Sequence, residues 1–370
     1  MALGPSPTPA DSLYPEIASL TGVPRFFPAP TDIRTSWLAE NVTPSLAADG
    51  ARLFFVTGGT TLETTAIGSG SLPTVIATVA DCHTIAQVAA AGNVVGFVEI
   101  APVGARSYDG CVASSSVTWS IWLSDINGAH KRRVASGIRL TNSDLTRAHP
   151  VWLGLTPSAF AYDRPNSPGL APTGETIVVN DVKTGKRLWA VQTEAAVIDL
   201  MFGGSTIGVL DREPTLRLSI ATADSPSLTP FAFPASSAAL SDDGRYVSWD
   251  TAANSSSGVP AGLATTDLTS GVTSLLAVPS EADRPAPLRP TVTTTGTGAA
   301  VAWFETLKDG IVYPAVDIAG AAIGGLYSTV QAPLWIALSG HIMTMVATDS
   351  DGRYTVAYAV DLSGSGFAHS

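Results

Sequence analysis

The chain has 370 residues, of which 45% are apolar and 14% are charged, and its formal net charge is −11. This acidic balance argues against nucleic acid as a partner, because phosphate binding needs a basic stripe and the sequence has one short basic run, His130 to Arg133. No apolar run reaches the roughly 18 residues of a membrane span, and 34 glycines with 26 prolines favour an all-β protein of many short strands.

Residues 1–31 are rich in proline and polar residues, which predicts a linker, followed by one domain over residues 32–370. The first residues lack the basic start and apolar core of a signal peptide. We expect an extracytoplasmic or cell-surface domain, anchored through a segment upstream of this sequence. A cytoplasmic protein is the alternative. The composition is typical of a bacterial protein.

The chain then divides into units of four strand-like runs. The first unit comprises residues 44–47, 51–56, 61–67 and 73–79, and the second comprises residues 85–90, 93–100, 117–125 and 131–135. Four more units occupy residues 151–191, 197–233, 238–278 and 290–329, and an incomplete seventh occupies residues 333–361. A phrase in which an alternating run ends in Asp before a Gly-containing turn returns about every 45 residues, a spacing typical of propellers and solenoids. Its copies begin at Asp125, Asp181, Asp267, Asp317 and Asp361.

The seventh unit lacks a fourth strand, and the strand-like residues 32–38 have no unit of their own. The sequence therefore predicts an all-β, seven-bladed β-propeller of four-stranded antiparallel blades, in which an N-terminal strand completes the last blade and removes an open sheet edge. Six or eight blades are the alternatives, because unit boundaries are uncertain by a few residues.

The turns at residues 48–52 and 241–246, together with the recurring Asp-to-Gly hairpins, resemble those of WD40-like propellers of the TolB type. This resemblance implies binding more often than chemistry, and it implies no universal site. Residues 184–189 resemble one repeat of quinoprotein propellers. Trp249-Asp250 lies on a second strand, where the Trp-Asp pair of a true WD40 repeat does not occur.

In such blades, every long loop falls on one face, here called the loop-rich face. These loops are residues 101–116, 142–150, 164–174 and 251–260. Insertions on one side of a repeat protein usually mark its binding surface, although long loops can also simply be tolerated there. The loops supply the candidate ligand-binding residues Arg106, Tyr108, Asp109, Arg147, His149 and Arg164.

The second strand of most units ends in or near an acid, which suggests a ring of carboxylates on the same face. The acids are Glu99, Asp163, Asp211, Asp250, Glu305 and Asp349. Such a ring would attract a cationic ligand, a metal or a basic partner. The alternative is that these acids cap turns and oppose edge pairing. Asp163, Asp211, Asp250 and Glu305 complete the set of candidate binding residues.

Cys82 and Cys111 are the only cysteines and fall on the same face, so we expect a disulfide and an oxidising compartment. Two unrelated thiols are the alternative. A metal site at Asp81, Cys82, His83 and Cys111 does not match the tighter spacing of zinc ligands. Asp349 to Gly352 lacks the third ligand of a calcium loop. We expect no metal and no cofactor.

The sequence shows no nucleophile elbow, Walker loop or dinucleotide fingerprint, and no catalytic residue is assigned. Arg147, His149, Asp163 and Arg164 could form an acid–base site, but a surface cluster without chemistry is the preferred explanation, because acid–base work needs positioned partners. We expect a non-catalytic binding or scaffold propeller that presents its loop-rich face to a protein, peptide or glycan, with a cationic ligand as one class. The alternatives are a glycosidase or lyase using carboxylates near the central channel, which needs at least two inward acids, and an eroded quinoprotein-like domain.

Overall fold

A computed structural model describes residues 31–32, 45–46, 52–66, 72–103, 116–140, 151–165, 174–212, 216–251, 262–276, 290–296, 298–306, 312–318, 321–324, 332–340, 342–348 and 355–361. Within these ranges the chain forms 27 strands and no helix. Accordingly, no helix long and apolar enough to cross a membrane occurs in the described residues.

The strands form five four-stranded sheets and one seven-stranded sheet, with antiparallel pairing between sequential strands. The first two sheets combine β2 (Ser45–Leu46), β3 (Arg52–Thr57), β4 (Thr61–Ala66) and β5 (Thr74–Thr78), and then β6 (Thr84–Ala91), β7 (Val94–Pro102), β8 (Ser116–Asp125) and β9 (Arg132–Leu140). The third combines β10 (Leu153–Leu155), β11 (Ala159–Pro165), β12 (Glu175–Asp181) and β13 (Arg187–Gln192).

The seven-stranded sheet runs through β14 (Val197–Gly203), β15 (Thr206–Arg212), β16 (Leu216–Thr222), β17 (Ser225–Leu240), β18 (Tyr246–Thr251), β19 (Gly262–Asp267) and β20 (Thr273–Leu276). The next sheet combines β21 (Thr291–Thr295), β22 (Gly298–Thr306), β23 (Val312–Ile318) and β24 (Ala321–Gly324). The last has the order β1-β27-β26-β25, with β25 (Ala332–Ser339), β26 (Ile342–Thr348), β27 (Thr355–Asp361) and β1 (Thr31–Asp32).

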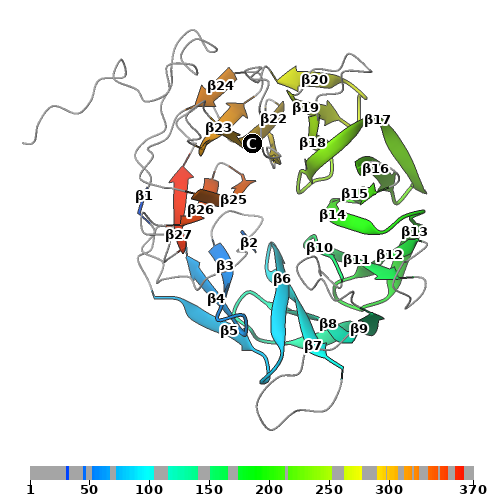
Figure 1. Ribbon diagram of the computed structural model, residues 1–370, viewed down its shortest axis with the longest axis vertical. Coiled ribbons are helices and arrows are strands. Elements are labelled where there is room, and N and C mark those ends of the chain that lie inside the picture. The colour runs from blue at the N-terminus through cyan, green and yellow to red at the C-terminus, as the bar shows by residue number, and fades with distance from the viewer. Residues whose placement is uncertain are drawn as a thin grey trace, which may run out of the picture.

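The sheets are arranged around a common centre (Figure 1), which is the arrangement expected of a propeller. Strands near the centre contact one another in succession, from β2 through β6, β10, β14, β17 and β21 to β25, and β25 in turn contacts β2. An N-terminal segment does pair with the last sheet, because Thr31 lies opposite Ala359 and Asp32 opposite Tyr358. Residues 33–38 of the predicted N-terminal strand lie outside the described residues.

Two strands differ from the sequence prediction. Residues 228–233 and 238–241 were expected in separate blades, but they belong to one continuous strand, β17, which pairs with β16 through its first part and with β18 through its second. The segment contains no glycine that would turn the chain. β9 continues to Leu140 instead of ending at residue 135. Gly137 does not break it, because the missing side chain makes room for Trp119, whose Cζ2 would lie 2.6 Å from an added Cβ.

The hydrophobic core lies between neighbouring sheets. Phe55 and Leu62 of the first sheet pack with Val88 and Phe97 of the second. The opposite face of the second sheet contributes Trp119, Ile121 and Leu123 to a cluster with Leu153 and Phe160 of the third. The tryptophans expected between blades are accordingly in the core or packed against it: Trp119 and Trp303 are buried, and Trp122, Trp152, Trp189 and Trp335 are partly buried.

The recurring Asp forms the hairpin turn between the third and fourth strands. The Asp181 carboxylate accepts hydrogen bonds from the Thr184 backbone N–H (2.6 Å) and hydroxyl (2.7 Å), and Gly185, at a φ of 69°, donates its N–H to the Asp181 carbonyl (2.8 Å). The hydrogen bonds from Thr184 lower the pKa of Asp181. The turn at Asp267 uses the same contacts, from Thr269 to its carboxylate and from Gly271 to its carbonyl. At Asp181 and Asp267 the repeated phrase is thus a self-capped turn.

Candidate functional site

About half of the residues proposed from the sequence lie outside the described residues: Arg106, Tyr108, Asp109, Arg147, His149, Cys111 and Asp349. Glu305 lies in β22 opposite Tyr313. Cys82 lies in the turn before β6 with a φ of 67°. The Cys82–Cys111 disulfide stays a prediction. Asp163, Arg164, Asp211 and Asp250 can be examined in detail.

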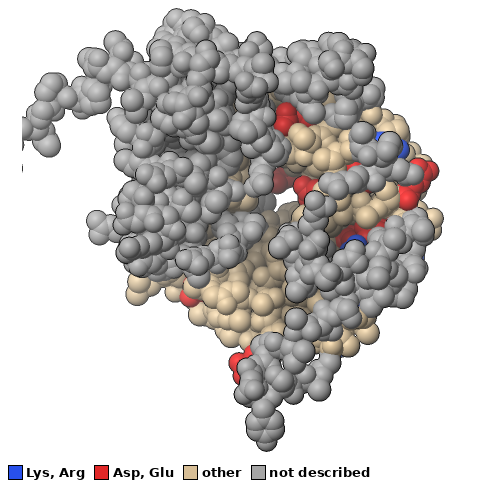
Figure 2. All heavy atoms as spheres, viewed as in Figure 1, with Lys and Arg blue, Asp and Glu red and all other residues tan. Residues whose placement is uncertain are grey.

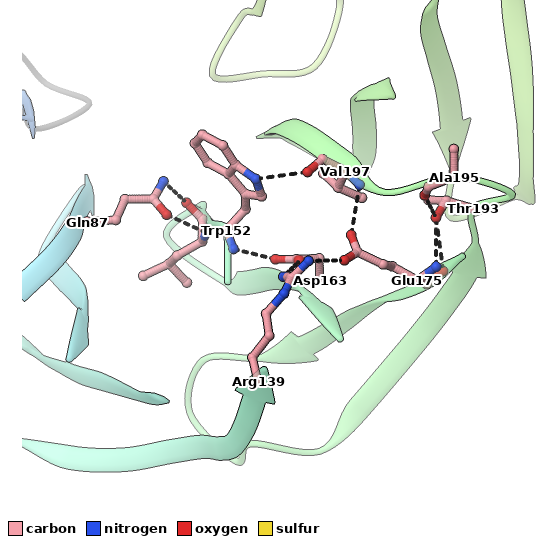
Figure 3. A network of polar contacts seen from close by, with 9 residues as sticks. Gln87, Arg139, Trp152, Asp163, Glu175, Thr193, Ala195 and Val197 are labelled. Atoms are coloured by element: carbon pink, nitrogen blue, oxygen red, sulfur yellow. Dashed lines mark hydrogen bonds and ion pairs between the residues drawn. The ribbon is translucent and has the colours of Figure 1, made fainter. Parts of the chain in front are cut away.

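Asp163 lies at the end of β11 in a buried ionic cluster that joins two sheets (Figure 3). The Arg139 guanidinium, from β9 of the preceding sheet, donates to the Asp163 carboxylate at 3.2 Å and to the Glu175 carboxylate at 2.5 Å. Both carboxylates are fully buried. These three residues, called here the Arg139 cluster, place two acids on one cation.

Backbone groups complete the Arg139 cluster. The Trp152 backbone N–H donates to Asp163, and the Val197 backbone N–H donates to Glu175 at 2.8 Å (Figure 3). Val197 belongs to the next sheet, so the cluster connects three consecutive sheets. Burial, followed by the charge of Glu175, raises the pKa of Asp163, and these effects outweigh the opposing effect of Arg139. With both carboxylates enclosed, the cluster holds sheets together and presents no charge to a ligand.

Asp211 and Asp250, two further acids of the predicted ring, also form hydrogen bonds with side chains near them in the sequence. Asp211 is buried and receives two hydrogen bonds from the Arg217 guanidinium, at 3.3 and 3.2 Å. Asp250 accepts a hydrogen bond from the Ser236 hydroxyl at 2.7 Å. Arg164 is exposed beside Asp163 in sequence. Asp163, Asp211 and Asp250 are thus each engaged by a neighbouring side chain of the same chain, and these side-chain contacts of the three carboxylates are not turn caps.

The centre of the molecule is the place where a propeller glycosidase or lyase would need converging acids. Figure 2 shows acidic atoms beside the central hollow. Among the described central strands β2, β6, β10, β14, β21 and β25 and the second half of β17, however, the single acid is Asp199 of β14. Burial raises the pKa of Asp199 to about 6. That chemistry needs a second carboxyl beside Asp199, and the described central strands contain none.

The structure adds a feature that the sequence analysis missed, a half-open cavity of about 460 Å³ against the second sheet. We call it the β9 cavity. It lies toward the loop-rich end of this sheet, since its wall includes the turn before β6, the end of β7 and the start of β8. Its walls are His83, Glu99, Ala101, Thr118, Trp119, Ser120, Trp122, Arg133, Ser136, Gly137 and Ile138.

The acid in the β9 cavity is hydrogen-bonded to its neighbours. The Glu99 carboxylate lies within hydrogen-bond distance of Nδ1 of His83 and accepts a hydrogen bond from the Trp122 indole N–H at 2.5 Å. The side chains of His83 and Glu99 are 33% and 14% exposed. Trp122 is itself fixed by stacking on Phe97 (6.4 Å between centroids) and by the Lys131 ammonium 5.3 Å from its ring. Arg133, by contrast, is exposed at the cavity wall.

Unequal strand length produces the cavity. β7, β8 and β9 have nine, ten and nine residues, whereas β3, β4 and β5 of the neighbouring sheet have six, six and five. The β3–β4 turn reverses within Gly58, Gly59 and Thr60, with positive φ at both glycines, and the Gly59 carbonyl accepts the Ile85 N–H at 2.7 Å. The described part of the shorter sheet stops there. A difference in strand length between the two sheets is the signal by which the sequence could have predicted the cavity. The predicted end of β9 at residue 135 hid this difference, because the strand continues to Leu140.

Comparison with known proteins identifies the fold. No family model and no curated protein sequence matches this chain. The propeller domain of the trilobed protease from Pyrococcus furiosus is similar with a TM-score of 0.57 at 10% identity, over 90% of this chain and 100% of that one. A puromycin hydrolase structure has a TM-score of 0.50 at 14% identity, over 87% of this chain and 52% of that one. TolB from Acinetobacter baumannii gives 0.41 at 12% identity, over 94% and 90%.

At these identities the likeness concerns the fold alone. The chain has an all-β, propeller-like fold of multiple antiparallel sheets, and the propeller fold implied by the predicted resemblance is confirmed at that level. At 10% and 14% identity, the propeller domain of a protease and a hydrolase do not decide between binding and catalysis in this chain.

Proposed function

We propose that this chain is a non-catalytic binding propeller that holds a peptide segment of a partner in the β9 cavity. The cavity carries the proposal: it is half open, and it combines an aromatic wall, hydroxyl groups and an exposed arginine, Arg133. Sites that bind ligands commonly combine such a hollow with a few fixed polar groups. Three of the acids at strand ends, Asp163, Asp211 and Asp250, are engaged by Arg139, Arg217 and Ser236.

The finer architecture belongs to the same proposal. We infer seven blades, of which two share β17, with the segment before β1 as a linker. The succession of central contacts from β2 back to β2 and the pairing of β1 with β27 support this count. A Cys82–Cys111 bridge at the loop-rich end would suit an extracytoplasmic protein, where disulfides persist.

A filled cavity tests the proposal. A phage-displayed library of random 12-residue peptides is selected on the immobilised full chain, and the enriched peptides are measured against Ser136→Trp, which places an indole in the β9 cavity. Ser274→Trp is the matched control, because Ser274 is an exposed serine on another outer strand, β20. We expect enriched peptides that bind wild type and S274W equally and lose at least tenfold in affinity for S136W. Failure to enrich peptides, or equal binding to S136W, overturns the proposal.

A further inference from the structure

β9 is an unusually long edge strand. It is the last strand of its sheet and has nine residues, whereas the last strands β5, β13, β20 and β24 have five, six, four and four. Within the described residues no strand pairs with its outer side. An edge strand presents unpaired backbone N–H and C=O groups, and proteins usually shorten, charge or cover such edges. The middle of β9, Val134 to Ile138, is uncharged and contains no proline, and Ile138 is 56% exposed.

The same strand forms one wall of the β9 cavity. Arg133 pairs in register with Trp122, Ser136 with Ser120 and Ile138 with Thr118, and all six residues line the cavity. An extended chain paired with β9 would direct alternate side chains to this side of the sheet. Main-chain hydrogen bonds would then hold the chain, and the cavity would select among its side chains.

The charges of the basic residues on and beside β9 indicate which group a side chain of the bound peptide carries. Arg139 is enclosed in its cluster, Arg132 donates to the Val182 carbonyl, and Lys131 lies over Trp122. Arg133 forms no ion pair with any described residue, and the carboxylate nearest to it in the cavity wall, Glu99, is already paired with His83 and Trp122. Although the chain as a whole is acidic, the charge without an ion-pair partner among the described residues of this wall is positive.

We infer that β9 captures an extended peptide by strand addition and that Arg133 pairs with a carboxylate of that peptide. This deepens the proposed function and rests on it. The carboxylate could be an acidic side chain or the C-terminus of the peptide, and both offer the same oxygen pair to a guanidinium.

The test modifies the peptide, so that the protein stays intact. Peptides from the selection above are synthesised as C-terminal acids and amides, with each Glu or Asp replaced by Gln or Asn. A second set carries N-methyl groups at even or at odd positions. Binding to the full chain is measured by fluorescence anisotropy. We expect one N-methyl register to weaken binding at least tenfold and the other to be tolerated, because only alternate N–H groups face β9. We expect about a tenfold loss when the carboxylate is removed, and the amide arm distinguishes the two sources.

Protein variants supply the matching arm. Arg133→Ala should lose about tenfold in affinity and bind the acid and neutral peptides equally, whereas Arg187→Ala, an exposed arginine at the start of β13, should behave as wild type. Cavity-dependent peptides that tolerate both N-methyl registers, or that bind equally well without a carboxylate, overturn this inference and leave the proposed function standing. A selection that yields no cavity-dependent peptide overturns the proposed function itself.

Discussion

Glu99 and Asp163 occupy similar places, near the end of the second strand of consecutive sheets, yet their surroundings differ. Asp163 is fully buried and held with Glu175 by Arg139, an arginine of the preceding sheet. Glu99 is held by residues of its own sheet, His83 and Trp122, at the wall of an open cavity. The difference lies in the preceding sheet. β9 is long enough to bring Arg139 over Asp163, whereas β3 to β5 are too short to reach Glu99 in this way. In this ring, the strand length of one sheet thus decides whether the acid at the end of the second strand of the next sheet is buried, as Asp163 is, or lies at a cavity, as Glu99 does.

Replacing Arg139, the cation beside the buried Asp163, should have the largest effect on the free energy of unfolding. Arg139→Met leaves Asp163 and Glu175 buried without their cation, which we expect to lower the free energy of unfolding by about 3–5 kcal/mol in urea denaturation. Arg133→Met on the same strand is the control: its side chain is exposed, so the expected change is within about 0.5 kcal/mol. Equal losses of unfolding free energy in the two variants would contradict the view that Arg139 stabilises the fold and the exposed Arg133 does not.

The pH dependence of stability gives a second contrast. Because burial and Glu175 raise the pKa of Asp163 to about 8, the folded state favours its protonated form, and the resulting stability is present below about pH 4 and lost as pH rises toward 8. Asp163→Asn should therefore reduce the fall in unfolding free energy between pH 5 and 8, by on the order of 2 kcal/mol.

Asp267 provides the control with the opposite sign. Its hydrogen bond with Arg245 lowers the pKa of Asp267 to about 2, so its contribution is lost only as the solution becomes strongly acidic. Asp267→Asn should keep the wild-type slope between pH 5 and 8. A slope for Asp163→Asn that coincides with both wild type and D267N would show that Asp163 does not titrate in this range.

Gly137 and Ser136 are neighbours in β9 whose positions face opposite sides of the sheet, so substitutions there allow the stability of the two sides to be compared directly. Gly137→Ala sets a methyl group against the Trp119 indole, on the face of the sheet opposite to the Ser136 side chain, with 2.6 Å between Cβ and Cζ2, and should destabilise the fold by about 1–3 kcal/mol. Ser136→Ala, on the cavity side, should change stability by less than about 0.5 kcal/mol. Thermal unfolding of both variants measures the contrast, and a neutral Gly137→Ala would mean that Trp119 can move aside.

The smallest effect is expected at the open side. Trp122→Phe removes the indole N–H that Glu99 accepts but keeps an aromatic ring against Phe97. Loss of one hydrogen bond to a partly exposed carboxylate should cost about 1 kcal/mol in urea denaturation. A loss as large as that expected for Arg139→Met would mean that the open side is as tightly coupled as the closed one.

The sequence predicted much of the fold and little of the site. Hairpins ending in Asp and Gly are local, so Asp125, Asp181 and Asp267 could be placed in turns from their neighbours alone. The acids at strand ends were also found, but their partners come from other sheets or from other strands. Arg139 lies 24 residues from Asp163 and 36 from Glu175, and no local sequence pattern predicts that its guanidinium contacts both carboxylates.

The sequence by itself determined an all-β chain of repeated antiparallel units, because alternation of apolar residues and turn chemistry act over a few residues. Tertiary structure decided where β9 and β17 end, which acids are enclosed and where a cavity opens. Those outcomes depend on how far one sheet extends beside the next, and such packing is set by contacts between segments distant in the chain.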